Sequence, residues 1–245
     1  MLKTLLSSGA ALSLAVGGYA YAAMWPASQM FGRTIIAGAD PNEFALTYDD
    51  GPNDPHTYRL LDLLARHQVR ATFFVIGRFV RQRPEIARAI AAGGHLIGNH
   101  TMTHPLLVLR SPAEARRELA GCNAAIEDAL GQPVRFFRPP HGGRRPDVLR
   151  AARELGLSPV MWNAMGYDWR PVAAQQIVAH VEEGIATNRR RGAGSNILLH
   201  DGGQAGIGQD RAATVAATAL LLEKYAGRAR FVTPDVWAFR APGKA

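Results

Sequence analysis

The regular alternation of short apolar runs with longer helical segments limits most strongly how this chain can fold. Apolar residues recur at helical spacing in segments near 57–67, 78–92, 111–130, 146–155, 171–190 and 210–226. Seven short runs around them are expected to be strands: Phe44–Tyr48, Arg70–Ile76, His95–Gly98, Val134–Arg138, Pro159–Trp162, Asn196–His200 and Arg230–Thr233. This alternation predicts a parallel sheet with helices outside it.

Seven strands in a chain of 245 residues, of which 47% are hydrophobic, favour one α/β barrel whose ring of strands need not be complete. Barrels of this kind take roughly 250 residues. An open, doubly wound sheet is the alternative. Such a sheet often carries a phosphate-binding, glycine-rich turn after its first strand. The turn at that place reads Asp49-Asp50-Gly51-Pro52, which favours the barrel.

The segment near 111–130 has the clearest helix ends. Ser111-Pro112-Ala113-Glu114 combines a capping box with proline at the first helical position, and Gly131 follows the last turn. We therefore expect this helix to begin after Ser111 and to end before Gly131.

The first 25 residues differ from the rest of the chain. Lys3 precedes an apolar stretch over residues 4–25, and Ala20-Tyr21-Ala22 fits a small-x-small cleavage site. This pattern predicts a secretory signal peptide, or a membrane anchor if cleavage fails. A buried amphipathic helix is the alternative, but no polar residue interrupts the stretch at helical spacing. We expect export, with the protein periplasmic, secreted or membrane-anchored facing outward, and residues 26–43 as a connector.

Charge and cysteine content exclude several classes of function. Lys and Arg number 28 and Asp and Glu 20, a net charge of +8 that favours acidic partners. The charge is spread out, and the run Arg189–Arg191 has no aromatic residues within it, so nucleic-acid binding is not expected. Cys122 has no partner for a disulfide or a zinc–thiolate cluster, so we expect it in the core. No segment indicates an obligate protein partner.

Polar residues gather at the carboxyl ends of the predicted strands. In parallel α/β folds these ends meet at one mouth, where active sites lie. Successive strands are followed or ended by Asp49 and Asp50, His100 and His104, Arg138, Asp168, and His200.

His100 and His104 are spaced so that one helical turn would bring both imidazoles to the same side, where they could share a metal. No Glu follows His100, as a zinc protease would require. A third ligand could come from Asp49-Asp50, although Asp-Asp-Gly-Pro is also good turn chemistry. Two His and one Asp leave coordination positions open, as in catalytic zinc sites and non-haem iron oxygenases. No sequence sign of an oxygenase cosubstrate pocket is present.

Arg138-Pro139-Pro140-His141-Gly142 is a rigid stretch whose amides could face a reacting carbonyl, with Arg138 orienting Asp49. A proline-rich surface loop is the alternative. Asp168-Trp169 could equally be a turn with a core tryptophan, and His200-Asp201 a polar strand end.

Five motifs taken together resemble the NodB-homology polysaccharide deacetylases, carbohydrate esterase family 4. They are Thr47–Pro52, Asn99–Pro105, Phe137–Pro140, Asp168-Trp169 and Ile197–Asp201, in this order. The resemblance covers roughly residues 40–235. It implies a distorted, incomplete (β/α) barrel with about seven parallel strands, and a deacetylase domain over residues 44–240.

The resemblance implies that Asp50, His100 and His104 bind a divalent metal, with zinc expected. It also implies that Asp49 is the general base and that Arg138 holds it.

On the other side of the expected site, the resemblance implies that His200 is the general acid, with Asp168 supporting it. The backbone amide of His141 would stabilise the oxyanion. Leu198 and Trp169 would shape the pocket for the acetyl methyl group.

The sequence departs from the family pattern at a few positions. Tyr48 stands where Phe is usual, and His141 where Tyr is common. Asn163 and Met165 stand where acidic residues often precede the Asp-Trp pair. We expect these departures to affect the pH optimum and the choice of substrate more than the type of reaction.

The expected activity is hydrolysis of N-acetyl groups on amino-sugar residues of a chitin-like or peptidoglycan-like glycan, with release of acetate. O-deacetylation of an acetylated polymer and deformylation of an amino sugar are alternatives with the same fold. A non-catalytic glycan-binding protein is an alternative of another class, and the complete set of six polar residues argues against it.

Overall fold

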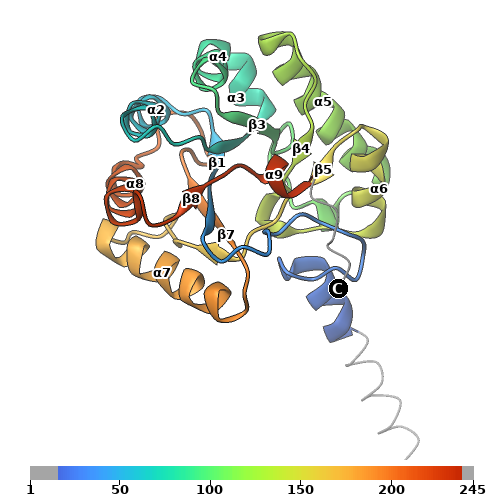
Figure 1. Ribbon diagram of the computed structural model, residues 1–245. Coiled ribbons are helices and arrows are strands. Elements are labelled where there is room, and N and C mark those ends of the chain that lie inside the picture. The colour runs from blue at the N-terminus through green and yellow to red at the C-terminus, as the bar shows by residue number, and fades with distance from the viewer. Residues whose placement is uncertain (1–15, 239–245) are drawn as a thin grey trace, which may run out of the picture.

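The computed structural model describes residues 16–238, and its strands form one parallel sheet curled into part of a barrel (Figure 1). The order across the sheet is β5-β4-β3-β2-β1-β7-β6, and β8 pairs with the start of β1. The strands are β1 Glu43–Gly51, β2 Thr72–Val75, β3 Leu96–Asn99, β4 Phe136–Phe137, β5 Ser158–Pro159, β6 Ala164–Met165, β7 Ser195–His200 and β8 Arg230–Phe231. Within residues 16–238, β5 and β6 form no pairing with each other, which leaves the ring open. The predicted incomplete (β/α) barrel is confirmed.

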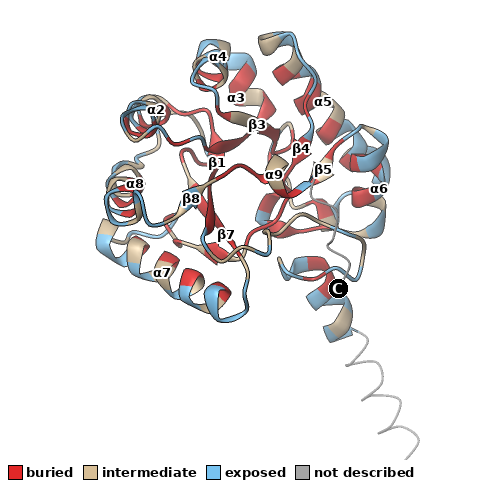
Figure 2. Cartoon of the chain, in the orientation of Figure 1, coloured by how far each residue is buried: buried red, intermediate tan, exposed pale blue. Residues whose placement is uncertain are grey.

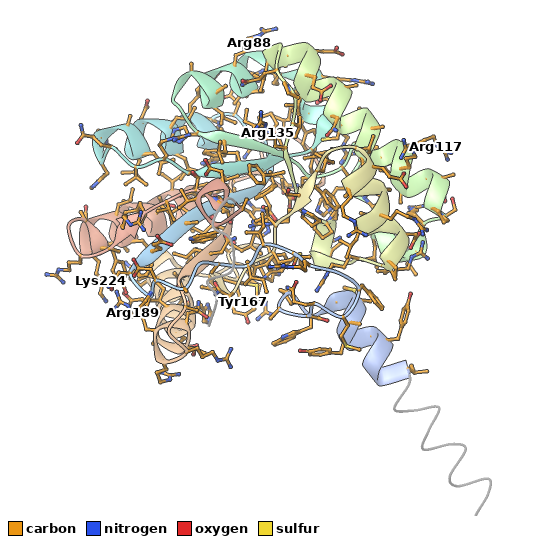
Figure 3. All side chains as sticks on the ribbon, turned by 45° about the vertical axis from the view of Figure 1, so that its right-hand side comes forward. Arg88, Arg117, Arg135, Tyr167, Arg189 and Lys224 are labelled. Atoms are coloured by element: carbon orange, nitrogen blue, oxygen red, sulfur yellow. The ribbon has the colours of Figure 1, made fainter. Side chains whose placement is uncertain are left out.

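Helices surround the sheet and bury their inner faces against it, as the red and blue sides of the ribbons show (Figure 2). They are α2 His56–Arg66, α3 Gly77–Gln82, α4 Pro84–Ala92, α5 Pro112–Leu130, α6 Pro146–Glu154, α7 Ala174–Arg190, α8 Ala212–Tyr225 and α9 Pro234–Ala238, with short 3₁₀ turns at Leu107–Leu109 and Pro140–Gly142. The labelled Arg88 and Arg117 of this ring project outward (Figure 3).

The ends of α5 are as predicted. The Ser111 hydroxyl accepts a hydrogen bond from the Glu114 amide, and the Glu114 carboxylate accepts one from the Ser111 amide. Gly131 ends the helix at φ 68°, a left-handed conformation that glycine adopts without steric cost. Cys122 is buried on the inner face of this helix.

Two of the expected elements differ from the structure. The helix expected near 78–92 is divided into α3 and α4, because Pro84 lacks an N–H and forces Arg83 out of the helical region, to φ −135°. The strand expected at Pro159–Trp162 is only Ser158–Pro159, and a further strand, Ala164–Met165, follows it. A strand of two residues is too short to show an alternating pattern of apolar and polar residues, so the sequence does not predict β6.

Strand β1 places alternate side chains on opposite faces, which separates the site from the core. Thr47 and Asp49 face Arg138 on one side. Tyr48 points to the other side, where its ring stacks on Phe73 and its hydroxyl lies 3.1 Å from that of Thr218. The unusual hydroxyl at residue 48 is therefore satisfied against α8 and does not reach the site.

The chain before β1 is packed onto the barrel. Residues 16–24 form a helix, and Ile35 pairs in parallel with Val160 at the open edge of the sheet. The Met161 amide donates to the Ile35 carbonyl at 2.7 Å. Residues 1–15 of the predicted signal segment, and residues 239–240 of the predicted domain, lie outside the described residues. Within the described part of the chain, no helix is both long enough and apolar enough to span a membrane.

Candidate active site

The polar residues expected at strand ends are brought to one mouth of the barrel. Asp49 and Asp50 lie at the end of β1, and Asp49 is in register with His200 on the neighbouring β7. His100 follows β3, and Arg138 follows β4. Asp168, expected after the fifth strand, instead follows the short β6. Residues separated by up to 151 positions thus meet, because all these strands run parallel.

Asp50, His100 and His104 form a compact group of potential metal ligands. One ligand atom from each lies within 4.8 Å of the others. Asp50 Oδ1 is 3.4 Å from His100 Nε2 and 3.0 Å from His104 Nε2. This oxygen is buried and accepts no hydrogen bond. A buried carboxylate oxygen without a donor is costly unless something else compensates it, and a cation does so.

Hydrogen bonds at the opposite nitrogen of each ring orient both histidines. His100 Nδ1 lies 2.7 Å from the Arg138 carbonyl, and His104 Nδ1 lies 2.8 Å from Gln204 Oε1. Both partners are acceptors, so Nδ1 carries a proton, and in the neutral ring that a metal requires the lone pair is on Nε2. Both Nε2 atoms face Asp50 Oδ1. This arrangement fits a divalent metal.

The Asp50 side chain is in the charged form that a metal requires. Burial raises the pKa of this carboxyl group, but its close contacts with His100 and His104 outweigh burial and hold the pKa well below the usual range. Two neutral imidazoles and one carboxylate leave coordination positions open for water and substrate. The donor set suits zinc and iron(II) alike.

The two histidines meet through a loop and not through a helical turn, so the predicted geometry is wrong although the predicted pairing is right. Their ring centroids are 4.9 Å apart. Thr101 and His104 adopt φ values of 68° and 63°. The Thr101 amide donates to Asn99 Oδ1, and the His104 amide donates to Thr101 Oγ1. A local network of short polar side chains therefore replaces the helix.

Left-handed backbone conformations concentrate at this mouth. Such conformations are uncommon for residues with a Cβ atom and gather where function constrains the chain. In residues 16–238, every non-glycine residue of this kind except Gln68 belongs to the mouth: Asp50, Thr101, His104, His141 and Tyr167.

Asp49 is held beside the ligand group by a fully buried arginine. Arg138 Nη1 donates to Asp49 Oδ1 and to Thr47 Oγ1, at 2.8 Å each. The other carboxylate oxygen, Oδ2, lies 3.6 Å from His100 Nε2. Arg138 Nη2 also donates to Asn196 Oδ1. One oxygen of Asp49 is therefore fixed, and the other faces the ligands.

His200 is oriented by Asp168 on the opposite side. His200 Nδ1 is 2.8 Å from Asp168 Oδ1, and Asp168 Oδ2 accepts from the His200 amide and from the Thr214 hydroxyl. Burial lowers the pKa of His200, but the Asp168 carboxylate outweighs it and raises that pKa to about 9. The imidazole is therefore protonated at neutral pH, with Nε2 free to donate.

Two of the three expected substrate-binding residues, His141 and Trp169, lie beside residues of the mouth. The His141 ring packs 4.8 Å from that of His104. Trp169 is 45% exposed and lies edge-on to His200, with centroids 5.4 Å apart. Leu198 is buried with Met161 and Trp162. Asn163 takes a structural part, because its side chain bonds the Asn196 amide.

Asp201 is a site residue to which the sequence assigned no role. Its side chain is fully buried, and its amide donates to the Asp49 carbonyl. Burial raises the pKa of Asp201 to about 7, and a hydrogen bond from Thr57 acts against this rise. Its position next to His200 in the Ile197–Asp201 motif was the signal available.

Comparison with known proteins identifies relatives of this architecture. A family model described as polysaccharide deacetylase matches residues 37–160. A chitooligosaccharide deacetylase of Rhizobium leguminosarum bv. trifolii is 41% identical over 68% of this chain and 74% of its own length. A peptidoglycan-N-acetylglucosamine deacetylase of Bacillus cereus is 35% identical over 77% of this chain and 84% of its own length.

Solved structures show the same similarity. The crystal structure of the Bc1960 peptidoglycan N-acetylglucosamine deacetylase has a TM-score of 0.73 and 32% identity, over 81% of this chain and 89% of that one. A CE4 family pseudoenzyme from Bacillus anthracis has a TM-score of 0.69 and 27% identity, over 78% of this chain and 63% of that one. The curled parallel barrel, the motifs at its mouth and these relatives agree, and the chain belongs to the NodB-homology polysaccharide deacetylases of carbohydrate esterase family 4.

Proposed function

We propose that this protein is a metal-dependent N-deacetylase that releases acetate from N-acetylated amino-sugar residues of a glycan. One observation carries the proposal: a carboxylate fixed by a buried arginine, and an imidazole kept protonated by the negative charge of a buried aspartate, lie beside one group of metal ligands. Relatives named for chitooligosaccharide and for peptidoglycan N-acetylglucosamine support this substrate class.

Asp50, His100 and His104 would hold the metal, which we propose to be zinc. A bound divalent metal supplies a Lewis acid that polarises the acetamide carbonyl and makes water more acidic. The chain supports this by keeping the Asp50 carboxylate charged and by directing both Nε2 atoms inward.

Asp49 would act as the general base. Its Oδ1 atom is occupied by Arg138, which leaves Oδ2 to take the proton from the attacking water. Arg138 also keeps the carboxylate from rotating. The backbone amide of His141 would donate to the developing oxyanion.

His200 would act as the general acid. Its Nδ1 atom is bound to Asp168, so Nε2 would protonate the leaving nitrogen. Protonation is needed because an amine anion is a poor leaving group. Trp169 and Leu198 would enclose the acetyl methyl group and the adjoining sugar ring.

An acetate-release assay on chitin oligomers, peptidoglycan and acetylated xylan tests this function. We expect acetate from the N-acetylated substrates. Acetate from xylan alone would indicate O-deacetylation, and formate from an N-formylated amino sugar would indicate deformylation. The likeness to a pseudoenzyme gives a further outcome: metal binding without turnover on any substrate would refute the proposal and indicate a glycan-binding protein.

Removal of the metal should abolish acetate release, and added zinc should restore it. Without the cation, no Lewis acid faces the substrate carbonyl. Turnover should be measured before chelation, after it and after zinc is returned, with circular dichroism at each stage to show that the fold persists. Full turnover in protein shown by elemental analysis to hold no metal would contradict the proposal.

Asp168→Asn should shift the basic limb of the pH–rate profile to lower pH. A general acid acts in its protonated form, so turnover should fall as pH rises through the pKa of His200. The Asp168 carboxylate raises that pKa to about 9, and removing its charge lowers the pKa again. The profile of kcat against pH measures this. Asp128→Asn, at an exposed aspartate of α5, is the matched control. A basic limb that stays in place in Asp168→Asn would exclude His200 as the acid.

We also propose that the protein is exported. The apolar residues 4–25 behind Lys3 support this, as a membrane anchor that is retained and not cleaved at Ala20-Tyr21-Ala22. Chitin-like and peptidoglycan-like glycans lie outside the cytoplasm, which agrees with the proposed substrate class.

A further inference from the structure

The exposed apolar side chains of the described protein are concentrated before β1. Outside this segment, the large exposed apolar residues are Leu109, Trp169 and Leu220. Residues 16–31, which we call the N-terminal face, expose Val16, Tyr19, Tyr21, Met24, Trp25 and Met30. Trp25 is 56% exposed, although its ring stacks on that of Tyr21. Exposed apolar side chains that gather in one segment in this way indicate an interaction surface.

The sequence around the N-terminal face carries no charge. After Lys3, the next charged residue is Arg33. Residues 4–15, which lie outside the described structure, are apolar or small and lead directly into the helix of residues 16–24. A face that continues an uncharged apolar stretch of the chain is suited to lipid more than to water.

The N-terminal face is fixed to the barrel by a buried arginine. Arg144 is 1% exposed, and its amide donates to the Ala23 carbonyl. Its guanidinium donates to the carbonyls of Trp25 and Ser28, at 2.7 Å each. Ala22 and Ala23 are themselves buried. The end of the predicted signal segment and the start of the predicted connector are therefore held against the domain at this point.

The same arginine reaches the mouth of the site. Arg144 Nη1 donates to the Gly142 carbonyl at 2.9 Å, and Gly142 follows His141. A Cβ atom on Gly142 would lie 3.5 Å from the Met24 carbonyl oxygen, which shows how closely the face approaches this loop. The helix of residues 16–24 lies at the outside of the barrel in Figures 1 and 3. The face and the mouth are thus parts of one packed unit.

We propose that the N-terminal face docks into the interfacial layer of a lipid bilayer, and that Arg144 holds the mouth of the site beside that bilayer. Tyr and Trp favour the membrane–water interface, where the ring is in an apolar layer and the polar atom is in water. The net charge of +8 attracts the domain to anionic lipid. Docking does not depend on the reaction. The further consequence, that the enzyme acts on glycan lying at the membrane surface, rests on the proposed function.

Tryptophan quenching in vesicles tests the docking. The full chain is reconstituted into vesicles of phosphatidylethanolamine and phosphatidylglycerol that contain lipids brominated near the headgroup. Comparison with Trp25→Phe isolates the signal of Trp25. We expect bromolipid to quench Trp25, and we expect Trp25 to be shielded from aqueous iodide.

Two further measurements complete the quenching experiment. Leu220→Trp in the Trp25→Phe background places a tryptophan on α8, away from the face, and should remain open to iodide and unquenched by lipid. The proposal is overturned if Trp25 behaves like that control. It is also overturned if Trp25 is shielded in a dimer without vesicles, because the face would then cover a second copy.

Hydrogen exchange tests the clamp. In Arg144→Met, we expect the amides of residues 22–28 to exchange about tenfold faster or more, since hydrogen bonds from a charged donor are lost. Arg116→Met, an exposed arginine on α5, should leave these amides unchanged. Unchanged exchange in Arg144→Met would refute the clamp. If that variant does not fold, fast exchange of residues 22–28 in the parent protein would refute it equally.

Discussion

Asp49→Asn is expected to lose nearly all acetate release while still binding the metal. The amide side chain has nearly the same shape as the carboxylate but cannot take a proton from water. General bases contribute about 10²–10⁴-fold to rate, so turnover should fall within that range. Asp49 Oδ2 lies 3.6 Å from His100 Nε2, close enough to serve an attacking water without belonging to the three-residue ligand group.

Metal titration calorimetry alongside the acetate assay separates this role from others. Asp62→Asn, an exposed aspartate on α2, is the matched control and should keep parental turnover and affinity. If Asp49→Asn keeps parental turnover, Asp49 is not the base. If the variant loses the metal together with turnover, Asp49 is a ligand and the assignment of roles at β1 must change.

Arg138→Met is expected to lower the free energy of unfolding by about 3–5 kcal/mol, because it leaves the buried Asp49 carboxylate without its partner. It also removes donors from Thr47 and Asn196. Arg117→Met, an arginine that projects outward in Figure 3, should change stability by no more than about 0.5 kcal/mol. Urea denaturation measures both variants.

The double variant identifies the cause of the instability. If the unpaired carboxylate is responsible, adding Asp49→Asn to Arg138→Met should recover part of the lost stability, since the buried charge is gone. Two losses that simply add would show that Arg138 acts through packing and through its other hydrogen bonds.

The alternation of strands and helices was sufficient to predict the barrel, because apolar residues recur at a regular spacing along each long element. The strand order and the open edge between β5 and β6 depend on pairings between distant residues, which no local period reports. β6 has two residues and left no signal. Pro84 is visible in the sequence, but the apolar spacing continues across it, so the division of one helix into α3 and α4 is apparent only in the structure.

The mouth could be predicted to the extent that its residues directly follow strands. Asp50 lies at the end of β1, and His100 and His104 lie in the loop after β3, and the three meet as expected. The roles of Gln204 and Thr214 could not be predicted because neither residue belongs to a sequence motif. Their contacts with His104 and Asp168 exist only once β7 and the following loop are in place. The left-handed backbone at Thr101 likewise depends on an Asn99 side chain whose part is apparent only in three dimensions.

Arg138 bears on how enzymes of this architecture can diverge. Its side chain fixes Asp49, and its backbone carbonyl fixes the His100 ring at 2.7 Å. Arg138 alone therefore contacts both the proposed proton acceptor and one of the proposed metal ligands. Natural variation can reshape the rim around Trp169, and so broaden the range of acceptable glycans, while the reaction itself is inherited unchanged. Loss of the reaction, in contrast, requires only one step at this position, so a lineage is expected to pass abruptly from catalyst to binding protein.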